Sequence, residues 1–151
     1  MIEIERKFLV LSNQYRKTSH RKTRIIQGYL SKDLERTVRV RIRDDQGFLT
    51  IKGISTDGGL SRFEWEKEIP LKDAKELMSI CLPEIIEKTR YEVNFKGFLF
   101  EIDEYEGIHK NLIVAEVELK STKDKIFLPE WIGKEVTGEK KYYNSHLSGK
   151  K

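Results

Sequence analysis

The first ten residues of the chain place ionisable side chains at every second position. In MIEIERKFLV, residues Glu3, Glu5 and Lys7 fall on one face of a strand, because successive side chains of a strand point to opposite sides. The apolar residues fall mainly on the other face. Two carboxylates at i and i+2 suit a divalent cation, and a lysine two residues later suits an anion that the cation also touches.

The same alternation of charged and apolar residues returns in at least six further segments. One charged strand face is commonly just the solvated side of a sheet, but that side normally includes threonine, serine and amides. Here the polar faces are almost entirely Glu, Asp, Arg and Lys. The segments are VRVRIR with Arg39, Arg41 and Arg43; LTIKG with Lys52; SRFEWEKEI with Arg62, Glu64, Glu66 and Glu68; EKTRYEVNF with Lys88 and Arg90; FLFEIDEY with Glu101 and Asp103; and VAEVELK with Glu116, Glu118 and Lys120.

These charged faces, if they converge inside one closed sheet, make the interior a channel rather than an apolar core. Isolated charges away from bulk water are costly, so such a channel needs a ligand that satisfies both signs. A polyanion bound together with divalent cations would do so.

The elements that must position these residues are mainly strands. A helix is predicted from Lys72 to Leu82, ended by Pro83, and short helical turns are predicted near 12–16 and 142–147. Many strands at short spacing with few helices favour a mainly β (α+β) fold, an antiparallel barrel with a few peripheral helices. The predicted strands lie near 1–10, 23–31, 35–44, 47–54, 62–70, 86–96, 98–106 and 112–120.

If the charged faces of the strands point into the barrel, their apolar faces point outward and must be covered by other parts of the protein. The few helices could cover only part of a barrel, so we expect an exposed apolar patch around Phe63, Trp65, Phe98 and Phe100. Such patches often become subunit contacts, and a homodimer is therefore expected.

Composition narrows the class of protein. The 151 residues suit one domain, 1–151, and a net charge of +4 from 29 basic and 25 acidic residues is too balanced for a nucleic-acid coat. No apolar run approaches a membrane span and the N-terminus is not a signal peptide, so we expect no nucleic-acid or membrane partner and a cytoplasmic location. The histidines lack zinc-site spacing, and no P-loop or Rossmann glycine motif is present.

An ordered series of motifs resembles the CYTH domain family, also called the triphosphate tunnel metalloenzymes. ExExK at residues 3–7 is the signature of that family. The resemblance implies an eight-stranded antiparallel β-barrel that encloses a charged tunnel and acts on triphosphate-bearing substrates with Mg2+ or Mn2+. The other motifs are GYL at 28–30, RVR at 39–41, TIKG at 50–53, RFEWE at 62–66, KTRY at 88–91, FEIDEYEG at 100–107, AEVEL at 115–119 and WIGKEVTGEKKYYNSHL at 131–147.

The alternation and the resemblance together suggest the metal ligands. Two ExE pairs on strands that meet in a barrel supply the hard oxygen ligands that Mg2+ or Mn2+ prefers. Glu101 and Asp103 could support a second ion, whereas Glu64 and Glu66 could orient arginines by ion pairing. The predicted metal ligands are Glu3, Glu5, Glu116, Glu118 and Asp103.

The basic residues of the same faces are candidates for phosphate binding. Arginine offers a planar fork for two hydrogen bonds, and lysine offers a point charge. A triphosphate carries about four to five negative charges near neutral pH, which six bases and a metal would match. The predicted phosphate-binding residues are Lys7, Arg39, Arg41, Lys52, Lys88 and Arg90, with Arg62 and Lys140 (beside Lys141) as second choices and Arg43 at the tunnel mouth.

The resemblance also places a tyrosine, Tyr29 of the GYL motif, in the tunnel. A buried phenol next to a lysine could accept a proton from an attacking water. Alternatively, Tyr29 only caps the barrel. The predicted catalytic set is Tyr29, Glu5 and Lys7.

The predicted reaction is metal-dependent hydrolysis of inorganic triphosphate to pyrophosphate and phosphate. The chain has no evident module for an organic group, and its last motif resembles the compact bacterial branch that is associated with this substrate. A thiamine triphosphatase and a class IV-type adenylyl cyclase of the same family remain alternatives, although cyclases tend to carry His-Phe ahead of the acidic motif and this chain begins at Met1. A non-catalytic polyphosphate- or nucleotide-binding module would gain little from so many tunnel carboxylates.

Overall fold

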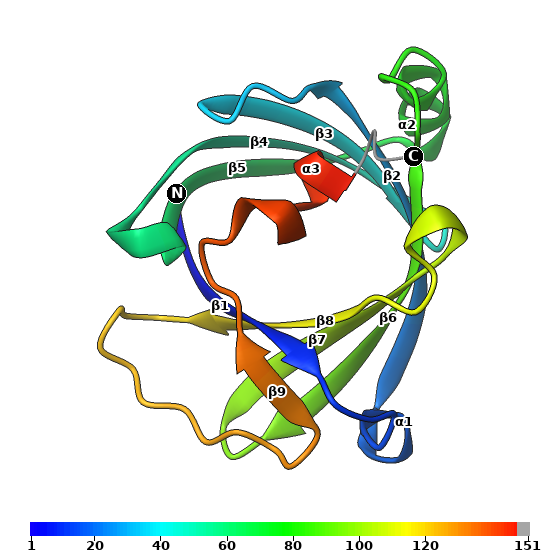
Figure 1. Ribbon diagram of the computed structural model, residues 1–151. Coiled ribbons are helices and arrows are strands. Elements are labelled where there is room, and N and C mark those ends of the chain that lie inside the picture. Colours follow the sequence, from blue (N-terminus) through cyan, green and yellow to red (C-terminus); the bar gives the residue numbers. More distant parts are fainter. Residues whose placement is uncertain (148–151) are drawn as a thin grey trace.

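Eight antiparallel strands form a closed barrel in the computed structural model, which describes residues 1–147 (Figure 1). The strand order is β5-β4-β3-β2-β6-β7-β8-β1, and the ring closes because β1 also pairs with β5. A ninth strand, β9, pairs with β1 outside the ring. The strands are β1 (Ile2–Val10), β2 (Arg21–Ser31), β3 (Arg36–Arg43), β4 (Gln46–Thr56), β5 (Ser61–Ile69), β6 (Ile86–Phe95), β7 (Phe98–Tyr105), β8 (Ile113–Leu119) and β9 (Ile132–Glu135).

The helices are short and lie mostly at the periphery. Helix α2 packs on β3 and β4, and the approach is so close that a Cβ atom on Gly47 would lie 2.6 Å from the Cβ atom of Ala74. Helix α3 instead lies within the opening of the barrel (Figure 1). The helices are α1 (Tyr15–Thr18), α2 (Leu71–Met78) and α3 (Asn144–Leu147), and the 3-10 turns are η1 (Asp57–Gly59), η2 (Gly107–His109) and η3 (Lys140–Tyr142).

The fold agrees with the mainly β barrel that the alternation predicts. All eight predicted strands are confirmed, with small shifts at their ends, whereas α2 ends at Met78 rather than Leu82 and β9 was not predicted. The predicted single domain 1–151 includes residues 148–151, which lie outside the described part. No helix within residues 1–147 is long and apolar enough to cross a membrane.

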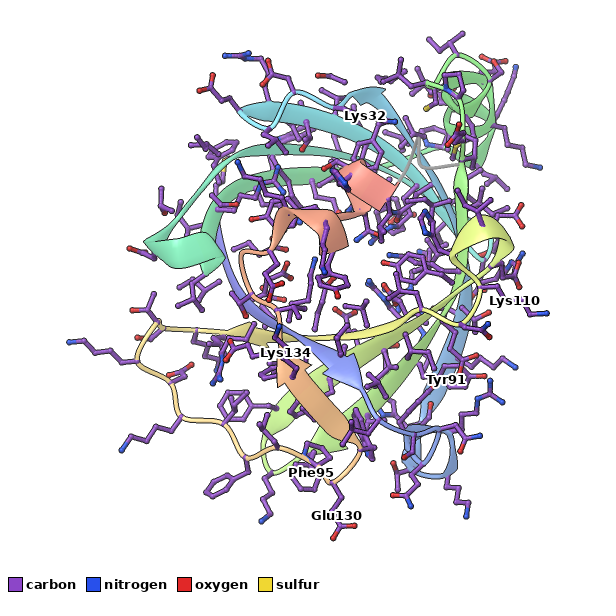
Figure 2. The ribbon with its side chains drawn as sticks, in the orientation of Figure 1. Lys32, Tyr91, Phe95, Lys110, Glu130 and Lys134 are labelled. Carbon is purple, nitrogen blue, oxygen red and sulfur yellow. The ribbon has the colours of Figure 1, made fainter. Side chains whose placement is uncertain are left out.

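The largest apolar core lies on the outside of the barrel wall, beneath β9 and α1. Tyr15 and Phe100 each pack edge-on against Trp131, with ring centroids 5.6 and 6.0 Å apart respectively. Figure 2 shows Tyr91 and Phe95 on this outer side, away from the polar side chains inside the ring. The outward apolar faces are therefore covered here by α1 and by the segment that contains Trp131 and β9, rather than by long helices.

The expectation of an exposed patch around Phe100 is wrong, because Trp131 and the segment before β9 cover this ring completely. Trp65 and Phe98 are half-buried, and only Phe63, at 43% exposure, remains largely open. The homodimer remains a prediction, but the four aromatic residues that suggested it do not form an exposed patch.

A second, smaller apolar cluster lies inside the barrel. Ile86, Tyr105 and Val114 alternate with the charged residues of β6, β7 and β8, so they share the inner face, and Leu147 of α3 packs on them. This cluster fills one part of the barrel interior.

Candidate active site

The charged strand faces enclose a cavity of about 230 Å³ inside the barrel. Its walls are made almost wholly of ionisable and hydroxyl side chains, as the polar side chains inside the ring in Figure 2 illustrate. The predicted site residues that line it are Glu3, Glu5, Lys7, Tyr29, Arg39, Arg41, Lys52, Arg62, Arg90, Glu116 and Glu118.

The two carboxylate pairs meet on neighbouring strands. In the antiparallel register of β1 and β8, Glu5 is opposite Glu118 and Lys7 is opposite Glu116. The ammonium of Lys7 lies 3.6 Å from a carboxylate oxygen of Glu116. Glu3 is opposite Arg62 where β1 closes the ring against β5. Closure of the barrel therefore brings together acids from both ends of the sequence.

The acidic cluster carries more negative charge than its surroundings offset. Burial, together with Glu116 and Glu3, raises the pKa of Glu5 well above its usual range. Burial alone would also raise the pKa of Glu116, but Lys7 and Arg90 hold it well below the usual value. A carboxyl whose pKa is raised by neighbouring carboxylates fits a site for a divalent cation.

Lys52 supplies part of the missing positive charge. Its Nζ atom lies 2.8 Å from Glu3 Oε1 and 3.3 Å from Glu64 Oε2. Burial would lower the pKa of Lys52, but Glu3 and Glu5 raise it. Within residues 1–147, no three acidic, histidine or cysteine side chains are already grouped tightly enough to hold a metal ion.

A basic cluster faces the acids from β3 and β6. Arg39, Arg41 and Arg43 share the inner face of β3, and Arg90 approaches from β6. Burial, and then the neighbouring charges of Arg39 and Arg90, lower the pKa of Arg41 to about 9. Crowded, buried guanidinium groups of this kind favour a bound anion.

Three predicted site residues lie outside the cavity wall. Asp103 and Lys88 are almost fully buried behind it and form an ion pair 2.7 Å apart. Lys140 is exposed in η3. Tyr29, by contrast, is buried in the wall, opposite Arg39 in the register of β2 and β3.

The model of the CYTH domain family matches residues 1–149. The chain belongs to the CYTH domain family. It is 44% identical to an inorganic triphosphatase of Acetivibrio thermocellus over 96% of this chain and 92% of that protein. It is 36% identical to an inorganic triphosphatase of Nitrosomonas europaea, over 98% and 97% of the two chains.

The solved structure of an inorganic triphosphatase has the same fold as this CYTH chain. The two share 32% sequence identity with a TM-score of 0.68, and the match covers 97% of this chain and 93% of the other. The resemblance inferred from the motifs is therefore confirmed at the level of family and barrel.

The CYTH barrel also contains site residues that the sequence motifs did not single out for a role. Tyr143, Asn144 and Ser145 line the cavity from the C-terminal segment. The Tyr143 ring lies 5.4 Å from the Lys7 ammonium, and its hydroxyl is 3.2 Å from the Ser55 hydroxyl. No strand alternation marks KKYYNS, so the sequence alone predicted only a helical turn there.

A close backbone crossing leads this segment into the barrel. Gly59 and Gly138 both have positive φ, and a Cβ atom on Gly59 would lie 2.3 Å from the Cα atom of Gly138. The amide of Val136 donates a hydrogen bond of 2.8 Å to the carbonyl of Lys7. Both contacts fix where the C-terminal segment enters the cavity, and only glycine fits such an approach without displacing the backbone.

Proposed function

We propose that this CYTH protein hydrolyses inorganic triphosphate to pyrophosphate and phosphate, and that it requires a divalent cation, Mg2+ or Mn2+. One observation carries the proposal: one cavity inside the barrel sets a carboxylate cluster on β1 and β8 against a buried guanidinium cluster on β3 and β6. A metal-bound polyphosphate satisfies both clusters at once. The names of the two bacterial relatives support inorganic triphosphate as the substrate.

The basic residues would bind and orient the triphosphate. Arg39, Arg41 and Arg90 would donate hydrogen bonds to phosphate oxygens, and Lys7 would bind an oxygen at the boundary with the acidic cluster. Because these cations are fixed before the reaction, they would stabilise the charge that develops on the phosphoryl oxygens and the leaving group. Lys52 and Arg62 would extend this contact along the wall.

The carboxylates of Glu3, Glu5, Glu116 and Glu118 would hold the cation. When bound, the cation would neutralise phosphate charge and act as a Lewis acid at a phosphoryl oxygen. We leave Asp103 out of this set, because both of its oxygens already accept hydrogen bonds from Arg90, and Lys88 pairs with it as well.

The attacking water needs an acceptor for its proton, and two residues of the cavity qualify. Glu5 lines the cavity, and its carboxylate, once ionised, would accept that proton. The Tyr29 side chain faces the same cavity. We assign the general base to this pair and the orientation of the phosphate to Lys7.

The test is phosphate release by the purified protein from inorganic triphosphate, ATP and thiamine triphosphate, each with Mg2+, Mn2+ or EDTA. The proposal predicts the highest kcat/KM for inorganic triphosphate and none in EDTA. Preferential turnover of thiamine triphosphate, or of ATP to a cyclic product, would replace the proposed substrate. Tight binding of triphosphate without any turnover would indicate a binding module instead.

A further inference from the structure

Gln27 is a fully buried amide on the inner face of β2, directly opposite Arg41 of β3. Its Oε1 atom accepts hydrogen bonds from both Nε and Nη2 of Arg41, at 2.9 and 2.8 Å. These two bonds occupy one edge of the planar guanidinium and fix its orientation. The other edge, formed by Nη1 and Nη2, has no partner among residues 1–147 and is free to bind two oxygens of an anion.

This neutral partner sets Arg41 apart from most other bases of the tunnel. Most bases of the tunnel form an ion pair, but Arg41 forms none with any residue of the described chain. Arg62 also forms none, and it donates a hydrogen bond of 2.6 Å to the Gly53 carbonyl. The tunnel bases that do form ion pairs are Lys7 with Glu116, Arg39 with Glu66, Arg43 with Glu92, Lys52 with Glu3, Lys88 with Asp103, and Arg90 with Asp103 and Glu101.

An amide and a carboxylate in this position would differ in charge but hardly in shape. Glutamate would hold the guanidinium in the same plane and would also neutralise it. Glutamine holds it and leaves the charge in place. That charge is held at a cost in the empty protein, since burial and the neighbouring Arg39 and Arg90 disfavour the cation. An anion bound to the free edge would remove this cost.

We propose that Gln27 is a positioning residue for the substrate phosphate: it fixes the guanidinium plane of Arg41 while leaving its positive charge available to a phosphate oxygen. The inference rests on the proposed function of the tunnel. The Nε2 group of Gln27 is also buried and has no hydrogen-bond partner among the described residues.

The experiment measures binding of inorganic triphosphate with Ca2+ by calorimetry, and KM and kcat with Mg2+. Gln27→Glu should weaken triphosphate binding by at least about tenfold and raise the melting temperature of the empty protein, because it pairs the buried guanidinium. Gln27→Met, which removes the acceptor and adds no charge, should raise KM more than it lowers kcat. Gln14→Glu, the same change at an exposed position outside the barrel, should leave binding and turnover unchanged.

A double-mutant cycle separates positioning from a general effect on the fold. In an Arg41→Ala background, Gln27→Met should change triphosphate binding by less than about twofold, because its effect acts through Arg41. The proposal would be overturned if Gln27→Met or Gln27→Glu bound triphosphate as tightly as the wild type. It would also be overturned if Gln27→Met weakened binding as much in the Arg41→Ala background as in the wild type. A wild-type protein that binds triphosphate without hydrolysing it would refute the proposed activity and still leave the binding comparison decisive for Gln27.

Discussion

Arg90 of β6 and Asp103 of β7 face each other directly, and the guanidinium donates two hydrogen bonds to the carboxylate, from Nε at 2.7 Å and from Nη2 at 2.9 Å. The Lys88 ammonium pairs with the same carboxylate at 2.7 Å. Burial would raise the pKa of Asp103, but Arg90 and Lys88 hold it below its usual value. One buried carboxylate thus organises two cations, Arg90 in the tunnel wall and Lys88 behind it.

The variant Asp103→Asn should therefore lose stability even when no metal or substrate is present. Removing the charge would leave the buried Lys88 without its counter-ion and Arg90 with Glu101 alone, a change that typically costs about 3–5 kcal/mol. Denaturant unfolding in EDTA measures this loss. The control Glu87→Gln removes a carboxylate from an exposed ion pair with Arg24 and should cost less than about 1 kcal/mol. An Asp103→Asn protein of full stability but reduced metal affinity would instead make Asp103 a metal ligand.

The pH dependence of stability should report on Lys88. Burial, with Arg90 and Arg41, lowers the pKa of this lysine to about 7 despite Asp103, whereas an unfolded lysine has a pKa of about 10.4. Below pH 7 Lys88 is protonated in both the folded and the unfolded protein. Between pH 7 and 10 it is protonated mainly in the unfolded chain. Stability of the empty protein should consequently rise with pH in that window, by at most about 1.4 kcal/mol per unit.

Comparison with Lys88→Met isolates this contribution from other titrating groups. The difference in free energy of unfolding, wild type minus variant, should increase between pH 7 and 10. A difference that is constant over this range would show that Lys88 keeps an ordinary pKa in the folded protein.

The variant Glu5→Gln should separate stability from activity. Burial, with the neighbouring Glu116 and Glu3, disfavours the ionised form of Glu5 in the empty tunnel, so a neutral amide of the same shape should leave the melting temperature unchanged or raise it. Turnover with Mg2+ should fall by about 100-fold or more, because the cation loses a charged ligand. Kinetics at limiting Mg2+ and calorimetry with Mn2+ provide the readouts, with Glu130→Gln on the outer loop as control. Normal turnover at limiting metal would remove Glu5 from the metal site.

Much of this arrangement could be predicted from the sequence because a strand repeats every two residues. Once Glu3, Glu5 and Lys7 were assigned to one face, the same rule assigned Arg39, Arg41, Glu116 and Glu118 to the inner wall, and the structure brings them together there. The resemblance to the CYTH family supplied the number of strands and the closure of the ring.

What could not be predicted depends on contacts between distant segments. Alternation assigns Asp103 to the inner face but does not reveal that Arg90 and Lys88 use its oxygens. The burial of Phe100 depends on Trp131, which is far away in the sequence. Gln27 carries no charge, so a search for ionisable residues passes over it, although its amide orients a central arginine. Strand β9 is too short for a recognisable period.

The most direct measurement is the thermal stability of the protein with triphosphate, pyrophosphate or orthophosphate, each with Ca2+ to limit turnover. A ligand that binds only the folded state at about 100 times its Kd stabilises it by about 2.7 kcal/mol, which raises the melting temperature of a domain of this size by several degrees. The account predicts stabilisation in the order triphosphate, pyrophosphate, orthophosphate, because the cavity matches the longest anion with its cation. An equal and small response to all three anions would contradict it, since exposed charges on an open sheet bind each of them weakly.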